Sequence, residues 1–183
     1  MTLEFANIIL SSLNILIAFF GVMFVLLTIY EFKTLHGLRK DIDKLKKEFR
    51  ESAHKTQMAS QRVVASYGTT NVDQQIKLLL EAVNIDPYVF NGYNALGYAY
   101  LQRNEKEKAI DAFKEAVARH PKEKNGYFDL AYGYLKAGDA DLAFKYLKKA
   151  VKIDPTSKED LKFDRGPYFE ELKADQRFSQ LIQ

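Results

Sequence analysis

The stretch that decides the fold is residues 90–155, FNGYNALGYAYLQRNEKEKAIDAFKEAVARHPKEKNGYFDLAYGYLKAGDADLAFKYLKKAVKIDP, in which one pattern is written twice. Each key position of the first copy is matched 34 residues later by the same residue or by one of similar character. The matched pairs are Tyr93 and Tyr127, Leu96 and Leu130, Gly97 and Ala131, Tyr100 and Tyr134, Ala109 and Ala143, Phe113 and Leu147, Ala116 and Ala150, and Pro121 and Pro155. Such a period predicts one helical unit repeated along the chain, with neighbours burying each other's apolar faces.

The small residues of the pattern have a physical role. We expect Gly97 and Ala131 where two helices cross, since a larger side chain there would push the helices apart. Asn104 and Gly138 fall in the turns, where each can adopt a left-handed conformation. The period and these residue types resemble the tetratricopeptide repeat, a helix–turn–helix unit that stacks into an α-solenoid. The resemblance implies an all-α fold with clear repeats at residues 90–123 and 124–157.

The phase of the repeat extends one unit upstream, over residues 56–89. Pro87 lies 34 residues before Pro121, and Ala82 occupies a position that is small in the later units. The first half departs from the pattern, because Ser66 stands where tyrosine recurs. We interpret this segment as a degenerate first repeat whose second helix is clear and whose first helix the pattern does not define.

Beyond Pro155 the pattern stops, because Gly166-Pro167 interrupts any further unit. Residues 158–183 contain an aromatic segment that begins at Tyr168, followed by Asp175-Gln176-Arg177-Phe178. This ending resembles the closing segment of many bacterial repeat proteins of the same family. The resemblance implies C-terminal capping helices, which hide the apolar face of the last repeat from water.

A different kind of segment opens the chain. After a short tail at residues 1–4, residues 5–30 carry no charge, and as a helix they would extend about 39 Å against about 30 Å of bilayer hydrocarbon. A secretory signal peptide is the competing interpretation, but it needs a basic start, a shorter apolar run and a cleavage site of small residues. We therefore expect an uncleaved transmembrane helix.

The segment after the apolar run, residues 31–55, is basic and indicates the orientation. Basic residues follow the run whereas none precedes it, which by the positive-inside tendency predicts an outside N-terminus and a cytoplasmic C-terminal domain. The seven basic residues are Lys33, Arg39, Lys40, Lys44, Lys46, Lys47 and Arg50. Apolar residues recur between them at Leu35, Leu38, Ile42, Leu45 and Phe49, which predicts an amphipathic helical stalk.

Polar and small residues of the apolar run share one helical stripe. They are Asn7, Ser11, Asn14, Ala18 and Gly21, continued by Val25 and Thr28. Small residues let transmembrane helices approach closely, and asparagine can hydrogen-bond across such an interface. Self-association as a homodimer and docking within a membrane complex are both open, as is a plain location of the first polar residues near the headgroups.

The remaining composition excludes several function classes. A net charge of +3 is too small to favour nucleic acid, and the absence of cysteine removes disulfides, thiolate metal sites and a cysteine nucleophile. The sequence has no phosphate loop, dinucleotide fingerprint or zinc motif, and His120 stands in a turn without an oriented partner. We expect no enzyme, no catalytic residue, no metal and no cofactor.

The resemblance implies that the first helix of each unit lines a concave groove. The groove positions are then Asn91, Asn94, Tyr98 and Gln102 in one unit, and Asn125, Asp129, Tyr132 and Lys136 in the next. They depart from the clamp of lysines, asparagines and arginine by which some family members hold chaperone tails. Amides and tyrosines instead suit a protein or peptide partner, although they can also be ordinary polar surface.

The sequence thus predicts a membrane-anchored adaptor or scaffold that recruits a protein or peptide partner to the membrane. We expect a single-pass protein of a bacterial inner membrane. The alternative is a structural or assembly subunit of a membrane complex that docks through its transmembrane helix. A periplasmic assembly factor is a third interpretation, and organelle import receptors share the order of anchor and repeats.

Overall fold

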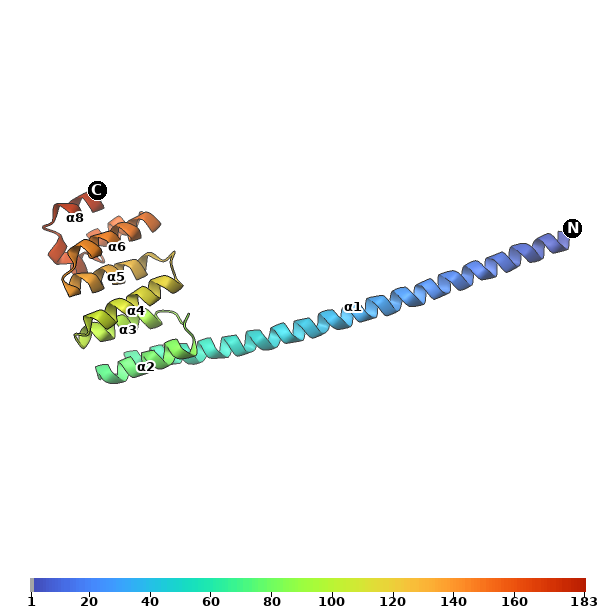
Figure 1. Ribbon diagram of the computed structural model, residues 1–183, viewed down its shortest axis with the longest axis horizontal. Coiled ribbons are helices and arrows are strands. Elements are labelled where there is room, and N and C mark those ends of the chain that lie inside the picture. The colour runs from blue at the N-terminus through green and yellow to red at the C-terminus, as the bar shows by residue number, and fades with distance from the viewer. Residues whose placement is uncertain (1) are drawn as a thin grey trace. The chain divides into compact units, whose positions relative to one another are not determined.

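The structure is a computed structural model that describes the backbone of residues 2–183 and the side chains from Leu13 onward. Every regular element in this range is helical, which confirms the all-α fold class (Figure 1). The elements are α1 (Thr2–Tyr67), α2 (Val72–Ile85), α3 (Gly92–Gln102), α4 (Lys106–Arg119), α5 (Lys124–Ala137), α6 (Ala140–Ile153), α7 (Ser157–Lys162), the 3-10 helix η1 (Gly166–Leu172) and α8 (Gln176–Ile182). The chain divides into two compact units, Met1–Ser52 and Ala53–Gln183.

The first unit consists of helix α1 as far as Ser52. Its apolar side chains from Leu13 onward are exposed, and α1 is long and apolar enough to cross a membrane. A signal sequence near an N-terminus passes the same test of length and composition. No charged group is present between residues 13 and 30, so a bilayer could accept this stretch without burying a charge.

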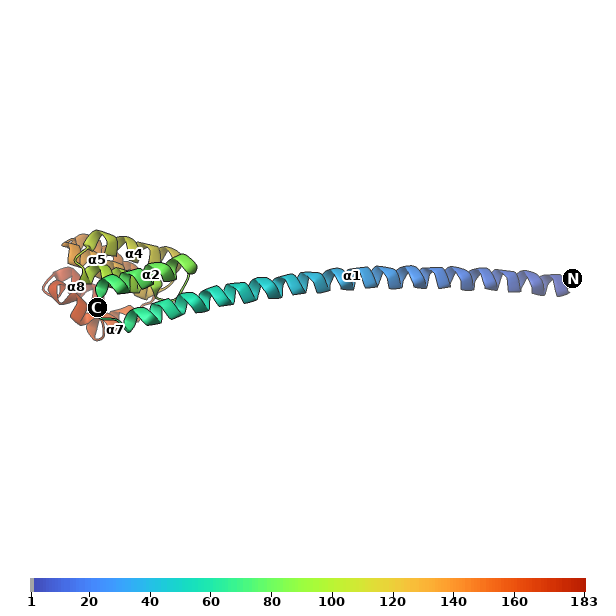
Figure 2. The ribbon, with the colours of Figure 1, turned by 90° about the horizontal axis from the view of Figure 1, so that it is seen from below.

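The second unit is a stack of antiparallel helices. Helices α2, α3, α4, α5 and α6 each pack against the next in chain order, so that α3 with α4 and α5 with α6 form two helical hairpins. Figures 1 and 2 show these five helices side by side. This arrangement is the α-solenoid that the repeated pattern predicts.

The last turns of α1 belong to this second unit and pack against α2. Ala59 and Val63 are buried in a cluster with Leu79 of α2. The hydroxyl of Thr56 donates to the carboxylate of Asp86 at 2.7 Å. The end of α1 therefore lies where the degenerate repeat needs a first helix, with small side chains in place of the aromatic ones of the later units.

The turns follow local chemistry. Asn104 and Gly138 have φ angles of 60° and 91°, as expected for left-handed residues that end a first helix. Asn71 caps α2, its side chain accepting from the backbone N–H of Gln74. Asn91 also has a φ of 60°, which the sequence pattern did not indicate.

The closest helix crossings are built around one aromatic ring. Phe113 of α4 is fully buried between Gly97 of α3 and Gly133 of α5. A Cβ atom at Gly97 would lie within 2.7 Å of three atoms of the Phe113 ring, and one at Gly133 would lie 2.9 Å from it. Two glycines are thus needed because α4 pushes a whole ring between its neighbours.

The three short helices α7, η1 and α8 cover the end of the stack. Leu161, Phe169 and Phe178 are buried in one apolar cluster with Phe144 and Leu147 of α6. The predicted capping segment therefore removes the apolar face of the last repeat from water.

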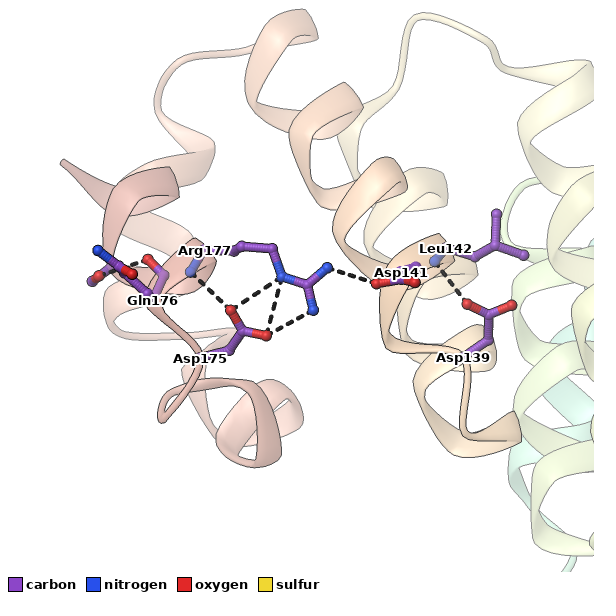
Figure 3. Close-up of polar contacts among 7 residues, drawn as sticks. Asp139, Asp141, Leu142, Asp175, Gln176 and Arg177 are labelled. Atoms are coloured by element: carbon purple, nitrogen blue, oxygen red, sulfur yellow. Dashed lines mark hydrogen bonds and ion pairs between the residues drawn. The ribbon is translucent and has the colours of Figure 1, made fainter.

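One arginine ties this cap to α6, as Figure 3 shows. The Arg177 guanidinium donates to Asp141 of α6 at 2.6 Å and to Asp175 at 2.7 Å, and it lies 4.3 Å above the ring of Phe144. Asp175 also caps α8, because its side chain accepts from the backbone N–H of Arg177. Asp139 caps α6 in the same way through Leu142, which agrees with a structural role for this acidic pair.

Candidate functional site

The eight groove positions come from two parallel first helices. Helix α3 carries Asn94, Tyr98 and Gln102, and Asn91 stands at its N-terminal cap. Helix α5 carries the other four, at Asn125, Asp129, Tyr132 and Lys136. Spacings of three and four residues along each helix keep each set on one side. The structure divides them into a buried polar network, a small polar hollow and an open aromatic hollow.

Asp129 is the centre of the buried network. Its side chain is 5% exposed, and its carboxylate accepts hydrogen bonds from Asn94 at 2.5 Å and from the Tyr98 hydroxyl at 2.6 Å. The Arg165 guanidinium lies 3.2 Å from the same carboxylate and supplies the compensating charge. A buried carboxylate held in this way is stable because every partner points at it, and it is not offered to another molecule.

The same network controls the ionisation of Tyr98. Burial raises the pKa of the Tyr98 hydroxyl well above its usual value, and the neighbouring Asp129 carboxylate raises the pKa further. The opposing influence of Arg165 is smaller. Tyr98 therefore stays neutral at physiological pH and serves as a fixed donor that links α3 to α5.

Arg165 is a functional residue that the sequence analysis missed. It precedes η1 in the cap, and it stacks over Phe128 while its second nitrogen approaches the Asn125 side-chain oxygen at 3.4 Å. One signal was available. Arg165 stands 34 residues after Ala131 and thus at the helix-crossing position, where a charged residue cannot continue a repeat.

Around this arginine the structure forms a small polar hollow of about 130 Å³. Its lining includes Asn91, Asn94, His120, Asn125 and Arg165. The volume is below the roughly 300 Å³ of typical small-molecule pockets, so this hollow can take a few waters or one side chain. Asn91 itself is engaged, since its amide donates to the Tyr67 hydroxyl at 2.6 Å.

A larger hollow of about 400 Å³ opens beside it. It is lined by Tyr98, Leu101, Gln102, Asn104, Lys106, Tyr132 and Lys136. The ring of Tyr132 contacts Tyr98 at a centroid distance of 6.1 Å and Tyr168 of η1 at 5.4 Å. The hollow therefore combines a tyrosine floor with two lysines and a glutamine amide.

The lysines of this hollow differ in their engagement. The Lys136 ammonium lies 5.3 Å above the Tyr132 ring and 2.9 Å from the Glu171 carboxylate, which raises the pKa of Lys136. Both Lys136 and Glu171 are solvent-accessible, so a ligand carboxylate can replace Glu171 at small energetic cost. Of the predicted groove residues, Gln102, Tyr132 and Lys136 are thus the ones brought together in the open hollow.

The predicted membrane interface is described only in part. Asn7 and Ser11 lie outside the residues whose side chains the structure describes. Asn14, Ala18 and Gly21 are exposed on α1, and a Cβ atom added at Gly21 would meet nothing within 4 Å. Within the described residues no group of histidine, aspartate and glutamate is arranged to hold a metal ion.

Comparison with known proteins places the fold. Residues 94–158 match the family model of the tetratricopeptide repeat. A crystal structure of MamA is similar, with a TM-score of 0.54 at 21% identity over 68% of this chain and 74% of that chain. Another MamA crystal structure gives a TM-score of 0.50 at 23% identity and covers 60% of each chain. The search of curated proteins gave no match. At these identities the likeness shows a shared tetratricopeptide-type solenoid and nothing about partners.

Proposed function

We propose that the chain is a membrane-anchored adaptor whose repeat domain binds an acidic peptide segment of a protein partner. The observation that carries this proposal is the open hollow of about 400 Å³ on the first helices of both clear repeats. Repeat domains of this architecture offer long concave surfaces, and the match of residues 94–158 to the tetratricopeptide repeat supports a role as a protein-interaction scaffold.

The chemistry of the hollow favours this class of ligand. Tyr98 and Tyr132 offer apolar area with few rotatable bonds, which suits a peptide side chain packed against them. Lys106 and Lys136 place two cations at the same hollow, and Gln102 can both donate to and accept from a peptide backbone. An extended segment with an apolar residue beside an acidic one would use all three groups.

The buried network has a supporting role in this proposal. Asn94, Asp129 and Arg165 are bonded to one another's side chains, directly or through the shared carboxylate. We therefore assign them to fixing the spacing of α3, α5 and the cap, and we assign ligand contact to Gln102, Tyr132 and Lys136. The boundaries of the repeats at 56–89, 90–123 and 124–157 and of the cap at 158–183 belong to the same proposal.

Membrane anchoring by residues 5–30 is the second part of the proposal. It is supported by the uncharged, exposed stretch of α1, which is apolar enough to cross a bilayer. The basic segment that follows supports a cytoplasmic repeat domain by the positive-inside tendency. The adaptor would then hold its partner close to the cytoplasmic surface of the membrane.

The experiment that tests the hollow is affinity purification of the full chain in mild detergent, with two charge-matched variants compared. Lys106→Glu with Lys136→Glu reverses both charges of the hollow. Lys148→Glu with Lys152→Glu reverses two exposed lysines of α6 that do not line it. We expect the partner to be lost with the first variant and kept with the second, because only the first repels an acidic segment.

Folding must be equal in both variants, which circular dichroism and thermal unfolding will check. Loss of the partner from both variants, or from neither, would contradict the hollow as the recognition surface. Retention by both variants, followed by loss when residues 5–30 are exchanged for an unrelated apolar segment, would support the assembly subunit that docks through its transmembrane helix.

A further inference from the structure

Helix α1 presents an exposed apolar stripe just beyond the uncharged stretch. Leu35, Leu38, Ile42, Leu45 and Phe49 are 42–75% exposed, all within the first unit of the chain. Their spacing is three and four residues in alternation, so Leu35, Ile42 and Phe49 take the a positions of a heptad and Leu38 and Leu45 the d positions. A soluble monomer would gain nothing from such a stripe, since it leaves large apolar side chains in water.

We propose that this stripe is the seam of a parallel two-stranded coiled coil formed with a second copy of the same chain. A leucine at each d position and a β-branched isoleucine at the central a position are typical of parallel dimers. The inference goes beyond the adaptor function and rests on the membrane anchoring proposed above, because both copies must enter the membrane in the same direction.

The charges that flank the stripe agree with this orientation. Asp41 and Glu48 take g positions, and Arg39 and Lys46 take e positions. In a parallel dimer the g position faces the e position five residues later on the partner, which pairs Asp41 with Lys46 of the second copy. An antiparallel pair would instead bring e beside e and g beside g, so that like charges face each other.

The column of a positions continues into the uncharged stretch. Thr28, Gly21 and Asn14 follow at intervals of seven residues, and all three are exposed. Glycine and threonine permit close approach of two helices in a bilayer, and asparagine can bond to its own counterpart there. Glu31 takes the d position before Leu35, where two carboxylates would face each other, so we begin the water-exposed seam at Leu35.

The length of the seam makes the membrane necessary. Two heptads form only a marginal coiled coil in water, because helix nucleation and association both cost entropy. Anchoring two chains in one bilayer removes part of the association cost by raising their effective concentration. The dimer is therefore a property of the full chain in a bilayer or micelle.

Cysteine crosslinking of the full chain tests the seam directly, since the natural chain has no cysteine. Single variants Leu38→Cys, Ile42→Cys and Leu45→Cys are placed on the seam, and Lys40→Cys and Lys47→Cys on the opposite f positions are the matched controls. A disulfide needs Cα atoms within about 7 Å, so oxidation of vesicle-embedded protein should give a dimer band at the seam and none at the controls. Equal crosslinking at both sets, or none at the seam, would overturn the proposal.

A charge exchange then tests the orientation. In the Ile42→Cys background, Asp41→Lys should lower the crosslinked fraction several-fold, because the introduced ammonium would face Lys46 of the second copy. Adding Lys46→Asp should restore the fraction, since the exchanged pair is again attractive. No loss with the single change, or no recovery with the double change, would contradict the parallel register.

Extraction of the same membranes with alkaline carbonate separates this inference from the anchoring on which it rests. A chain released by carbonate would fail the anchoring proposal and with it this inference. A chain that stays in the membrane and yields no seam crosslink would fail the dimer alone.

Discussion

Phe113 shows how one residue determines the composition of its neighbours. Its ring fills the space between α3 and α5, and Gly97 and Gly133 leave that space open. Gly97 is matched by Ala131 in the next unit, where Leu147 replaces Phe113. The exchange of glycine for alanine thus accompanies the exchange of a large ring for a smaller side chain, as close packing requires.

Replacing Gly97 by alanine tests this packing. The added methyl would overlap the buried ring, so we expect the free energy of unfolding to fall by about 1–3 kcal/mol, the usual cost of overpacking. Denaturant unfolding monitored by circular dichroism measures the change. Gly37→Ala is the control, because a Cβ atom there meets nothing within 4 Å.

The relief of the overlap provides a second check on Gly97. Adding Phe113→Leu to Gly97→Ala recreates the pair found in the next unit. The double variant should be more stable than the sum of the two single effects indicates. Strict additivity would argue against a direct steric conflict between the two positions.

At the scale of elements, the cap is held to the repeats by charge as well as by apolar contact. The Lys124 ammonium of α5 lies 2.8 Å from Asp154, which follows α6, and 2.9 Å from Asp160 of α7. Hydrogen bonds from Lys124 and Thr156 lower the pKa of Asp154 to about 2, and the two carboxylates raise the pKa of Lys124. One lysine thus connects the last repeat to the cap.

This connection predicts an acid dependence of stability. The pKa of Asp154 is depressed in the folded chain, so its stabilising contribution is complete above the unfolded pKa of about 3.9. The contribution is lost as the pH falls toward about 2, because the carboxylate is then protonated in both states. In Lys124→Gln the pKa of Asp154 should return toward its usual value, and less stability should be lost in this window.

Denaturant unfolding of the full chain at a series of pH values between about 5 and about 2.5 measures this difference, since the window spans the two pKa values. Lys122→Gln, which removes a neighbouring exposed lysine, should keep the acid dependence of the natural chain. An identical pH profile for Lys124→Gln and the natural chain would show that the ion pairs do not contribute to holding the cap.

At the scale of the whole molecule, the decisive property is the contrast between an uncharged first stretch and a nearly neutral repeat domain. The seven basic residues of 31–50 exceed its four acidic ones, and this excess equals the net charge of +3 of the entire chain. Concentration of the positive charge beside the apolar stretch predicts one orientation in the membrane, with the repeats in the cytoplasm.

Single cysteines at the two ends test this orientation. Thr2→Cys should react with a membrane-impermeant maleimide in intact cells, whereas Ser179→Cys, an exposed position of α8, should react only after permeabilisation. The reverse pattern would place the repeats outside, as a periplasmic factor. Exchanging Lys40, Lys44 and Lys47 for glutamine should weaken the preference, since it removes charges that retain the segment inside.

Local pattern alone determined the helical stack, its turns and its cap. The fold class, the left-handed turns at Asn104 and Gly138 and the apolar contacts of Phe169 and Phe178 follow from periodicity and residue chemistry within about one repeat. Such features can be predicted because each depends on neighbours within a few helical turns.

The tertiary structure decided which groove residues are free. Asp129 takes its partners from Asn94, which lies 35 residues away, and from Arg165, which lies 36 residues away. These contacts depend on how successive units are stacked, and no local periodicity records the choice. The sequence therefore predicted a groove and its residue types, whereas only the packing of the cap separated the buried polar network from the open tyrosine hollow.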